Sequence, residues 1–102
     1  MQLSSAVCDW IERAGYKGDL SAVAAGLYDV TEAVDKIRNE MVPILEKLDW
    51  RNAKQLDRAL DILYDLHFEF KHIRDHCEAA DEPLFGVMRF VEEKLEAQKN
   101  QG

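Results

Sequence analysis

All three histidines of the chain lie between residues 65 and 77, in the segment DLHFEFKHIRDHC, together with one of the two cysteines. In a helix, residues three or four apart lie on neighbouring turns of one face. Glu69, His72 and His76 have this spacing, and a carboxylate with two imidazoles suits zinc and similar divalent transition metals. The segment therefore predicts a candidate metal site made of these three side chains, with Asp65 on the same face.

The alternative is a solvent-exposed, charged helix face that binds no metal. Metal sites in helical bundles draw ligands from several helices that point inward. The apolar residues of this helix define a side opposite to Glu69, His72 and His76. The acidic residues Asp29, Glu32 and Glu40 of the preceding helix are likewise expected to project away from the apolar seam of that helix. Such a surface cluster could instead act as a proton switch, because nearby carboxylates favour the charged form of a histidine. We expect no cofactor, and zinc or another divalent transition metal is the alternative.

Two long apolar seams predict the helices that carry this segment. In each seam the apolar residues alternate at steps of three and four, the heptad pattern of a helix that packs lengthwise against a partner. The members are Leu20, Val23, Leu27, Val30, Val34, Ile37, Met41, Ile44 and Leu48 in the first seam, and Leu56, Ala59, Leu63, Leu66, Phe70, Ile73, Cys77 and Ala80 in the second. Antiparallel pairing would bring Leu27 near Cys77 and Val34 near Phe70.

The predicted fold is all-α and consists of one domain over residues 1–102. Its centre is a long antiparallel helical hairpin, with helices over 20–48 and 52–80 joined at a corner where Asp49 or Asn52 is the candidate cap. Pro43 is expected to kink the first of these helices near residues 39–43, because proline lacks a backbone donor and clashes with the preceding turn.

Short helices are expected on both sides of the hairpin. One covers residues 4–14 and ends at Gly15, and the other covers residues 83–97 and starts at the sequence DEP, since proline and acidic residues are favoured in a first turn. Together the elements predict a four-helix-bundle-like arrangement that dimerisation completes.

The second long helix carries more apolar surface than one partner helix covers. Four apolar residues lie outside its seam: Ile62, Leu60, Tyr64 and Phe68. Tyr28 lies outside the seam of the first helix. The flanking helices would cover these side chains, or self-association would do so. We expect a homodimer, and we take Tyr64, Phe68, Leu60 and Tyr28 as a candidate interaction surface for a protein partner.

Composition restricts the class of partner. The 102 residues include 13 Lys and Arg against 20 Asp and Glu, a net charge of −7, which argues against nucleic acid as a partner. Two cysteines are too few for a disulfide framework and indicate reduced thiols in the cytoplasm. No apolar run approaches the roughly 20 residues that span a bilayer, and the N-terminus lacks the features of a secretion signal. We therefore expect no membrane association.

No catalytic arrangement is apparent in the sequence. Phosphate-binding glycine loops, nucleophile elbows and paired cysteines are missing, so we expect no catalytic residues and no enzyme activity. The sequence favours a small non-enzymatic helical module with an interaction or regulatory role, which acts through protein–protein contacts. The alternative is a metal-binding or redox helical protein that uses Glu69, His72 and His76.

Overall fold

The computed structural model describes residues 3–101, and all regular structure in this range is helical, which confirms the all-α class. The helices are α1 (Leu3–Arg13), α2 (Ser21–Lys36), the π-helical turn η1 (Ile37–Met41), α3 (Val42–Lys47) and α4 (Ala53–Gln101). The chain measures 69 × 24 × 23 Å, with a radius of gyration of 20.0 Å. A compact domain of 100 residues has a radius of gyration of about 13 Å. The single chain is thus extended and does not by itself form a compact bundle.

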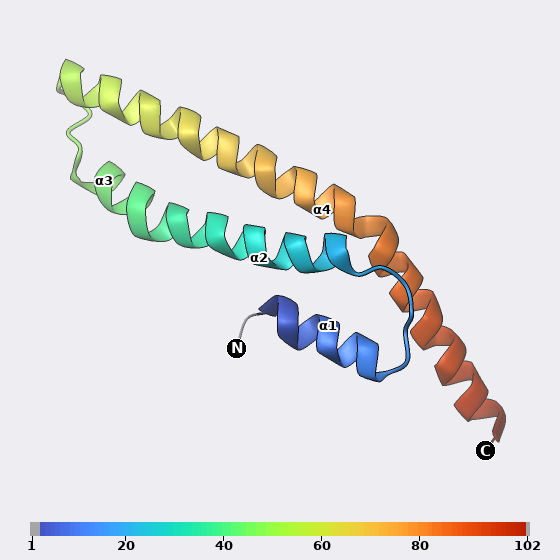
Figure 1. The fold of residues 1–102 in the computed structure, drawn as a ribbon. Coiled ribbons are helices and arrows are strands. Elements are labelled where there is room, and N and C mark those ends of the chain that lie inside the picture. The colour runs from blue at the N-terminus through green and yellow to red at the C-terminus, as the bar shows by residue number, and fades with distance from the viewer. Residues whose placement is uncertain (1–2, 102) are drawn as a thin grey trace.

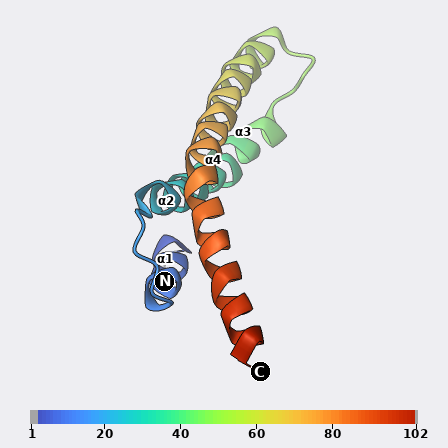
Figure 2. The same cartoon turned by 90° about the vertical axis from the view of Figure 1, so that its right-hand side faces the viewer.

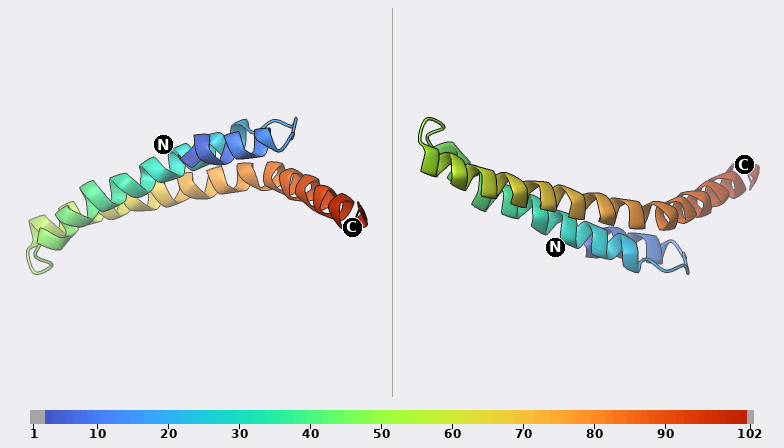
Figure 3. Two further views of the ribbon diagram at one scale, coloured as in Figure 1. Left: turned by 90° about the horizontal axis from the view of Figure 1, so that it is seen from below. Right: turned by 90° about the horizontal axis from the view of Figure 1, so that it is seen from above.

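The helices pack over only part of this length. α2 lies beside α4 and runs in the opposite direction, while α1 packs on the N-terminal half of α2 (Figure 1). Views from below and above show that the C-terminal end of α4 projects beyond the other helices (Figure 3). Figure 2 shows the same end continuing past α1 and α2. Residues 91–100 are accordingly all exposed.

The core is small and lies where α1, α2 and α4 meet. Its buried members are Cys8, Ile11, Leu20, Val23, Ala80 and Val87. Tyr16, in the loop after α1, packs edge-on against Phe90 of α4 with ring centroids 5.4 Å apart. No large side chain among the described residues is completely buried. Because small domains depend on a well-filled core, this one gains little stability from its own apolar burial.

Gly15 ends α1 as the sequence predicts. Its φ is 99°, which favours glycine, and its N–H donates to the Glu12 carbonyl at 3.0 Å. The Tyr16 N–H donates to the Ile11 carbonyl at 3.4 Å, completing a Schellman cap. After the loop, the Asp19 carboxylate accepts a hydrogen bond of 2.9 Å from the Ser21 N–H at the start of α2. The first predicted helix, residues 4–14, is confirmed to within one residue at each end.

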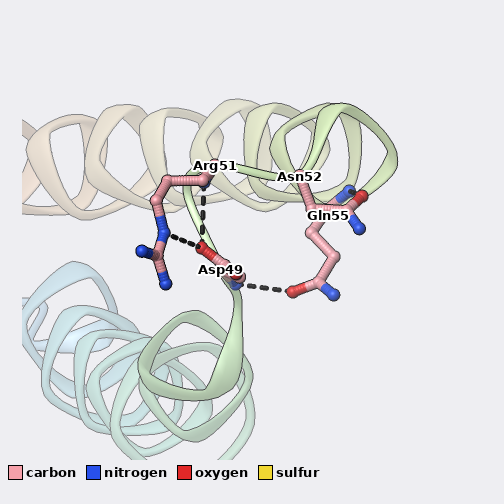
Figure 4. A network of polar contacts seen from close by, with 4 residues as sticks. All are labelled: Asp49, Arg51, Asn52 and Gln55. Atoms are coloured by element: carbon pink, nitrogen blue, oxygen red, sulfur yellow. Dashed lines mark hydrogen bonds and ion pairs between the residues drawn. The ribbon is translucent and has the colours of Figure 1, made fainter.

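The corner before α4 is held by side chains that accept backbone hydrogen bonds (Figure 4). Asn52 Oδ1 accepts from the N–H groups of Lys54 and Gln55 at 3.0 and 3.3 Å, so Asn52, and not Asp49, is the N-cap of α4. The Gln55 side chain accepts from the Asp49 N–H, outside the helix. Asp49 Oδ1 in turn accepts from the Arg51 N–H and from Arg51 Nε, at 3.0 and 3.2 Å.

Pro43 distorts the first long helix without dividing it. The π-helical turn η1 ends two residues before Pro43, and the Val42 N–H donates to the Ile37 carbonyl, five residues back. Pro43 then occupies the first turn of α3, where its missing N–H leaves few hydrogen bonds unmade. The expected irregularity near residues 39–43 is therefore present, and it takes the form of a widened turn.

The prediction of separate helices over 52–80 and 83–97 is wrong. α4 runs without a break from Ala53 to Gln101 and contains Pro83 in its interior. A proline inside a helix removes one hydrogen bond and bends the axis, and α4 changes direction in this region (Figure 1). Past the bend, Val87 joins the core and Phe90 meets Tyr16, so packing offsets the lost hydrogen bond.

Candidate functional site

The face of α4 that packs against α2 is rotated from the predicted one. The residues along this face are the least exposed ones of the paired part of α4: Gln55, Ala59, Ile62, Leu66, Glu69, Ile73, His76 and Ala80. They alternate at steps of three and four as expected, but four of the eight differ from the predicted residues: Gln55, Ile62, Glu69 and His76 stand where the prediction had Leu56, Leu63, Phe70 and Cys77. The predicted seam is wrong for this half, and Phe70 and Cys77 are exposed.

Glu69 is the one buried charged residue among those described, with 8% of its surface exposed. Its Oε1 lies 3.2 Å from Lys36 Nζ of α2, so a cation compensates the buried carboxylate. The expectation that Glu69 points outward is therefore wrong. The sequence pattern of one helix could not reveal this, because the compensating charge lies on another helix.

His76 and Asp29 form a second polar pair across the same contact. His76 Nε2 lies 2.9 Å from Asp29 Oδ2, and their side chains are 21% and 35% exposed. His72, one turn before His76, points its Nε2 to within 2.9 Å of His76 Nε2. The ligand atoms of Asp29, His72 and His76 all lie within 4.8 Å of one another, so one carboxylate and two imidazoles from two helices converge on one point.

This cluster contains two of the three predicted metal ligands. His72 and His76 come together as expected, Asp29 takes the place given to Glu69, and the expectation that Asp29 projects away is wrong. The sequence does contain a signal for this arrangement, which the prediction missed: acidic and basic residues have the same spacing on the two helices. Asp29 and Lys36 are seven residues apart on α2, as are Glu69 and His76 on α4, so antiparallel pairing matches an acid with a base twice.

α4 also carries an apolar stripe that stays partly exposed in the single chain. Its members recur at every seventh position: Leu56, Leu63, Phe70, Cys77, Leu84 and Val91. We call this set the outer stripe. All six are exposed, and the five apart from Cys77 have 37–58% of their surface accessible. Leu60, Met88 and Leu95 extend the stripe at its two ends and are about half exposed.

An apolar groove adjoins the outer stripe where α1, α2 and α4 meet. Its lining includes Leu3 and Val7 of α1, Leu27 and Val30 of α2, and Cys77 and Leu84 of α4. Two stripe residues therefore form one wall of the groove. The exposed apolar surface of this side of the molecule thus extends from α4 across to α1.

The predicted interaction surface is exposed. Tyr64 and Phe68 are 65% and 66% accessible, and Leu60 and Tyr28 are close to half accessible, so the flanking helices do not cover them. Leu60 adjoins the outer stripe. Phe68 lies two residues from Phe70 and therefore on another side of α4. On α2, a hydrogen bond with Glu32 and the charge of that carboxylate raise the pKa of Tyr28.

In comparisons with known proteins, no family model, no curated protein and no solved structure matches the chain. None of the helices among residues 3–101 combines the length and the apolar character needed to cross a membrane. Two local features of the structure bear on function: the outer stripe and the Asp29–His72–His76 cluster.

Proposed function

We propose that this protein is a small non-enzymatic helical module that acts through protein–protein contacts, and that a second copy of the chain covers the outer stripe. The observation that carries the proposal is the stripe itself. Apolar side chains at a strict seven-residue interval are typical of a helix that packs lengthwise on another helix. In the single chain these side chains face solvent.

The length of the stripe and the small core support self-association. From Leu56 to Val91 the stripe extends about 50 Å along the helix, at 1.5 Å per residue. Exposed contiguous apolar surface of this kind marks interaction sites on soluble proteins. A second copy would bury the stripe and part of the adjoining groove, and would convert the α2–α4 hairpin into half of a four-helix bundle.

Charges within the stripe favour an antiparallel dimer. Between its heptad positions, the stripe contains His67, Arg74 and Asp81, which are polar and lie near its middle. A parallel dimer in register would set Arg74 against Arg74 and Asp81 against Asp81. An antiparallel dimer centred between residues 77 and 78 sets Arg74 of each copy opposite Asp81 of the other, so unlike charges meet.

Sedimentation velocity over a concentration series tests the proposal on the full chain. The wild type is expected to sediment as a dimer at micromolar concentration. Phe70→Asp places a charge in the outer stripe and should yield a monomer at the same concentration. Phe68→Asp is the matched control, since Phe68 is also an exposed phenylalanine of α4 but lies outside the stripe.

Two results would overturn the proposal. One is a wild-type monomer throughout the micromolar range, which would leave the outer stripe without a second copy to cover it. The other is a dimer that Phe68→Asp dissociates and Phe70→Asp does not, which would move the contact to the surface that contains Tyr64 and Phe68. Circular dichroism of each variant verifies that the helices are retained.

A further inference from the structure

We propose that Asp29, His72 and His76 bind one divalent first-row transition metal ion, such as Zn²⁺, which links α2 to α4. This site differs from the one that the sequence suggested, because its oxygen ligand comes from α2. The donor atoms are Asp29 Oδ2, His72 Nε2 and His76 Nε2.

The separations of the donor atoms fit a tetrahedral ion. Zn²⁺ binds histidine nitrogen and carboxylate oxygen at about 2.0–2.1 Å, which sets two ligands of a tetrahedron about 3.3 Å apart. His76 Nε2 lies 2.9 Å from each of the other two donors, and all three fall within 4.8 Å. Small side-chain rotations therefore suffice to seat the ion between the two helices.

Hydrogen bonds alone satisfy this arrangement poorly. His76 Nε2 faces two groups at 2.9 Å, the Asp29 carboxylate and His72 Nε2. If His76 Nε2 carries a hydrogen, that single hydrogen must serve two acceptors. If it carries a lone pair, the lone pair faces a negatively charged oxygen. A cation removes the conflict, because all three atoms then direct lone pairs at one positive centre.

The ligand types define the class of ion. Two imidazoles favour zinc and its transition-metal neighbours over Mg²⁺ and Ca²⁺, which prefer oxygen ligands. Three protein ligands leave a fourth position, and it faces solvent because His72 is exposed. The ion would join side chains that are more than forty residues apart in the sequence, and so would clamp α2 against α4.

The site does not depend on the proposed dimer. Residues two apart in a helix point about 160° away from each other, so His72 and Phe70 lie on opposite sides of α4. A monomeric protein could still bind the ion, and a dimer could form without it. Failure of the metal site and failure of the dimer are therefore separate results.

The test uses the full chain purified without a histidine tag and stripped of metal with a chelator. Equilibrium dialysis against Zn²⁺, with elemental analysis, should give one ion per chain. Titration with Co²⁺ should produce the visible absorption of a tetrahedral ion with nitrogen and oxygen ligands. Asp29→Asn and His72→Gln should each weaken Zn²⁺ binding at least about tenfold, since even partners of metal ligands contribute that much.

His67→Gln is the matched control, because His67 is the one histidine outside the cluster and is also exposed. It should bind Zn²⁺ as the wild type does. The proposal is overturned if the wild type binds less than one ion per chain at saturation, or if His67→Gln weakens binding as much as His72→Gln. One ion per two chains would also overturn it, since the metal would then belong to a contact between copies.

Discussion

Lys36 of α2 and Glu69 of α4 place an ammonium nitrogen and a carboxylate oxygen 3.2 Å apart, and two turns along the helices Asp29 and His76 repeat the pairing with acid and base exchanged. The two pairs lie at the contact between α2 and α4, where apolar residues would give a simpler seam. Shifting one helix by two turns would set Asp29 against Glu69, or Lys36 against His76, and so bring like charges together. The polar pairs therefore act against slippage, a role that buried polar groups have in other paired helices.

Removing Lys36 should destabilise the protein by more than its partly exposed ion pair contributes. Lys36→Ala leaves the Glu69 carboxylate inside the helix contact without a cation, and we expect a loss of about 1–2 kcal/mol in the free energy of unfolding. The double variant Lys36→Met with Glu69→Leu makes the seam apolar at both positions, and it should be at least as stable as the wild type.

Urea unfolding followed by circular dichroism measures these differences. Lys71→Ala is the control, because Lys71 is an exposed lysine of α4, the helix that contains Glu69, and its loss should change stability by less than about 0.5 kcal/mol. If Lys36→Ala lowers the free energy of unfolding no more than Lys71→Ala does, Lys36 does not compensate the buried charge of Glu69.

The sequence could predict those features of the α2–α4 contact that depend on the apolar spacing of α4 alone. Ala59, Leu66, Ile73 and Ala80 belong both to the predicted seam and to the observed one. Their heptad spacing can be read from the sequence of α4 alone, so the prediction placed these four residues at the contact correctly. The opposing pairs Asp29 with His76 and Lys36 with Glu69 also match the expected antiparallel pairing to within two residues.

The apolar character of α4 could not predict the other half of this face, which contains Ile62, Glu69 and His76. α4 is apolar over so much of its circumference that two stripes share one edge, and the more apolar one contains Leu63, Phe70 and Cys77. The structure packs the less apolar one, because α2 offers charged partners to Glu69 and His76. The predicted helix boundary at Pro83 was wrong for a related reason. The packing of Val87 and Phe90 beyond Pro83 offsets the backbone hydrogen bond that the proline removes.

Metal binding should stabilise the folded chain. The ligands come from two helices, so the unfolded chain lacks the site, and binding raises the free energy of unfolding by about 2.7 kcal/mol at a free Zn²⁺ concentration of 100 times Kd. For a chain of this size the melting temperature should rise by about 10 °C or more. Thermal unfolding with and without Zn²⁺ measures the shift. At the same Zn²⁺ concentration Asp29→Asn should lower the shift to about half or less and His67→Gln should retain it, whereas an equal shift in Asp29→Asn would contradict the prediction.

Cys8 should react with alkylating agents more slowly in the folded protein than in the unfolded one. Burial raises the pKa of the Cys8 thiol, and the charges of Glu12 and Asp9 raise it further. At a given pH less of it is the reactive thiolate, so the alkylation rate of the folded protein should reach its plateau at a higher pH than in urea. Peptide mapping by mass spectrometry follows Cys8 and the exposed Cys77 in one sample. Equal rates for Cys8 in the folded and unfolded states would contradict the prediction.

Reversal of the charges in the outer stripe should reveal the orientation of the dimer. In the antiparallel arrangement, Arg74→Asp confronts Asp81 of the second copy with a like charge, and we expect dimerisation to weaken about tenfold. Adding Asp81→Arg restores the unlike pair in both contacts of the dimer and should recover the wild-type affinity. A parallel dimer would behave differently, because each substitution there replaces one like-charge pair by another. Sedimentation equilibrium of the single and double variants therefore separates the two orientations, and a double variant no tighter than Arg74→Asp would exclude the antiparallel one.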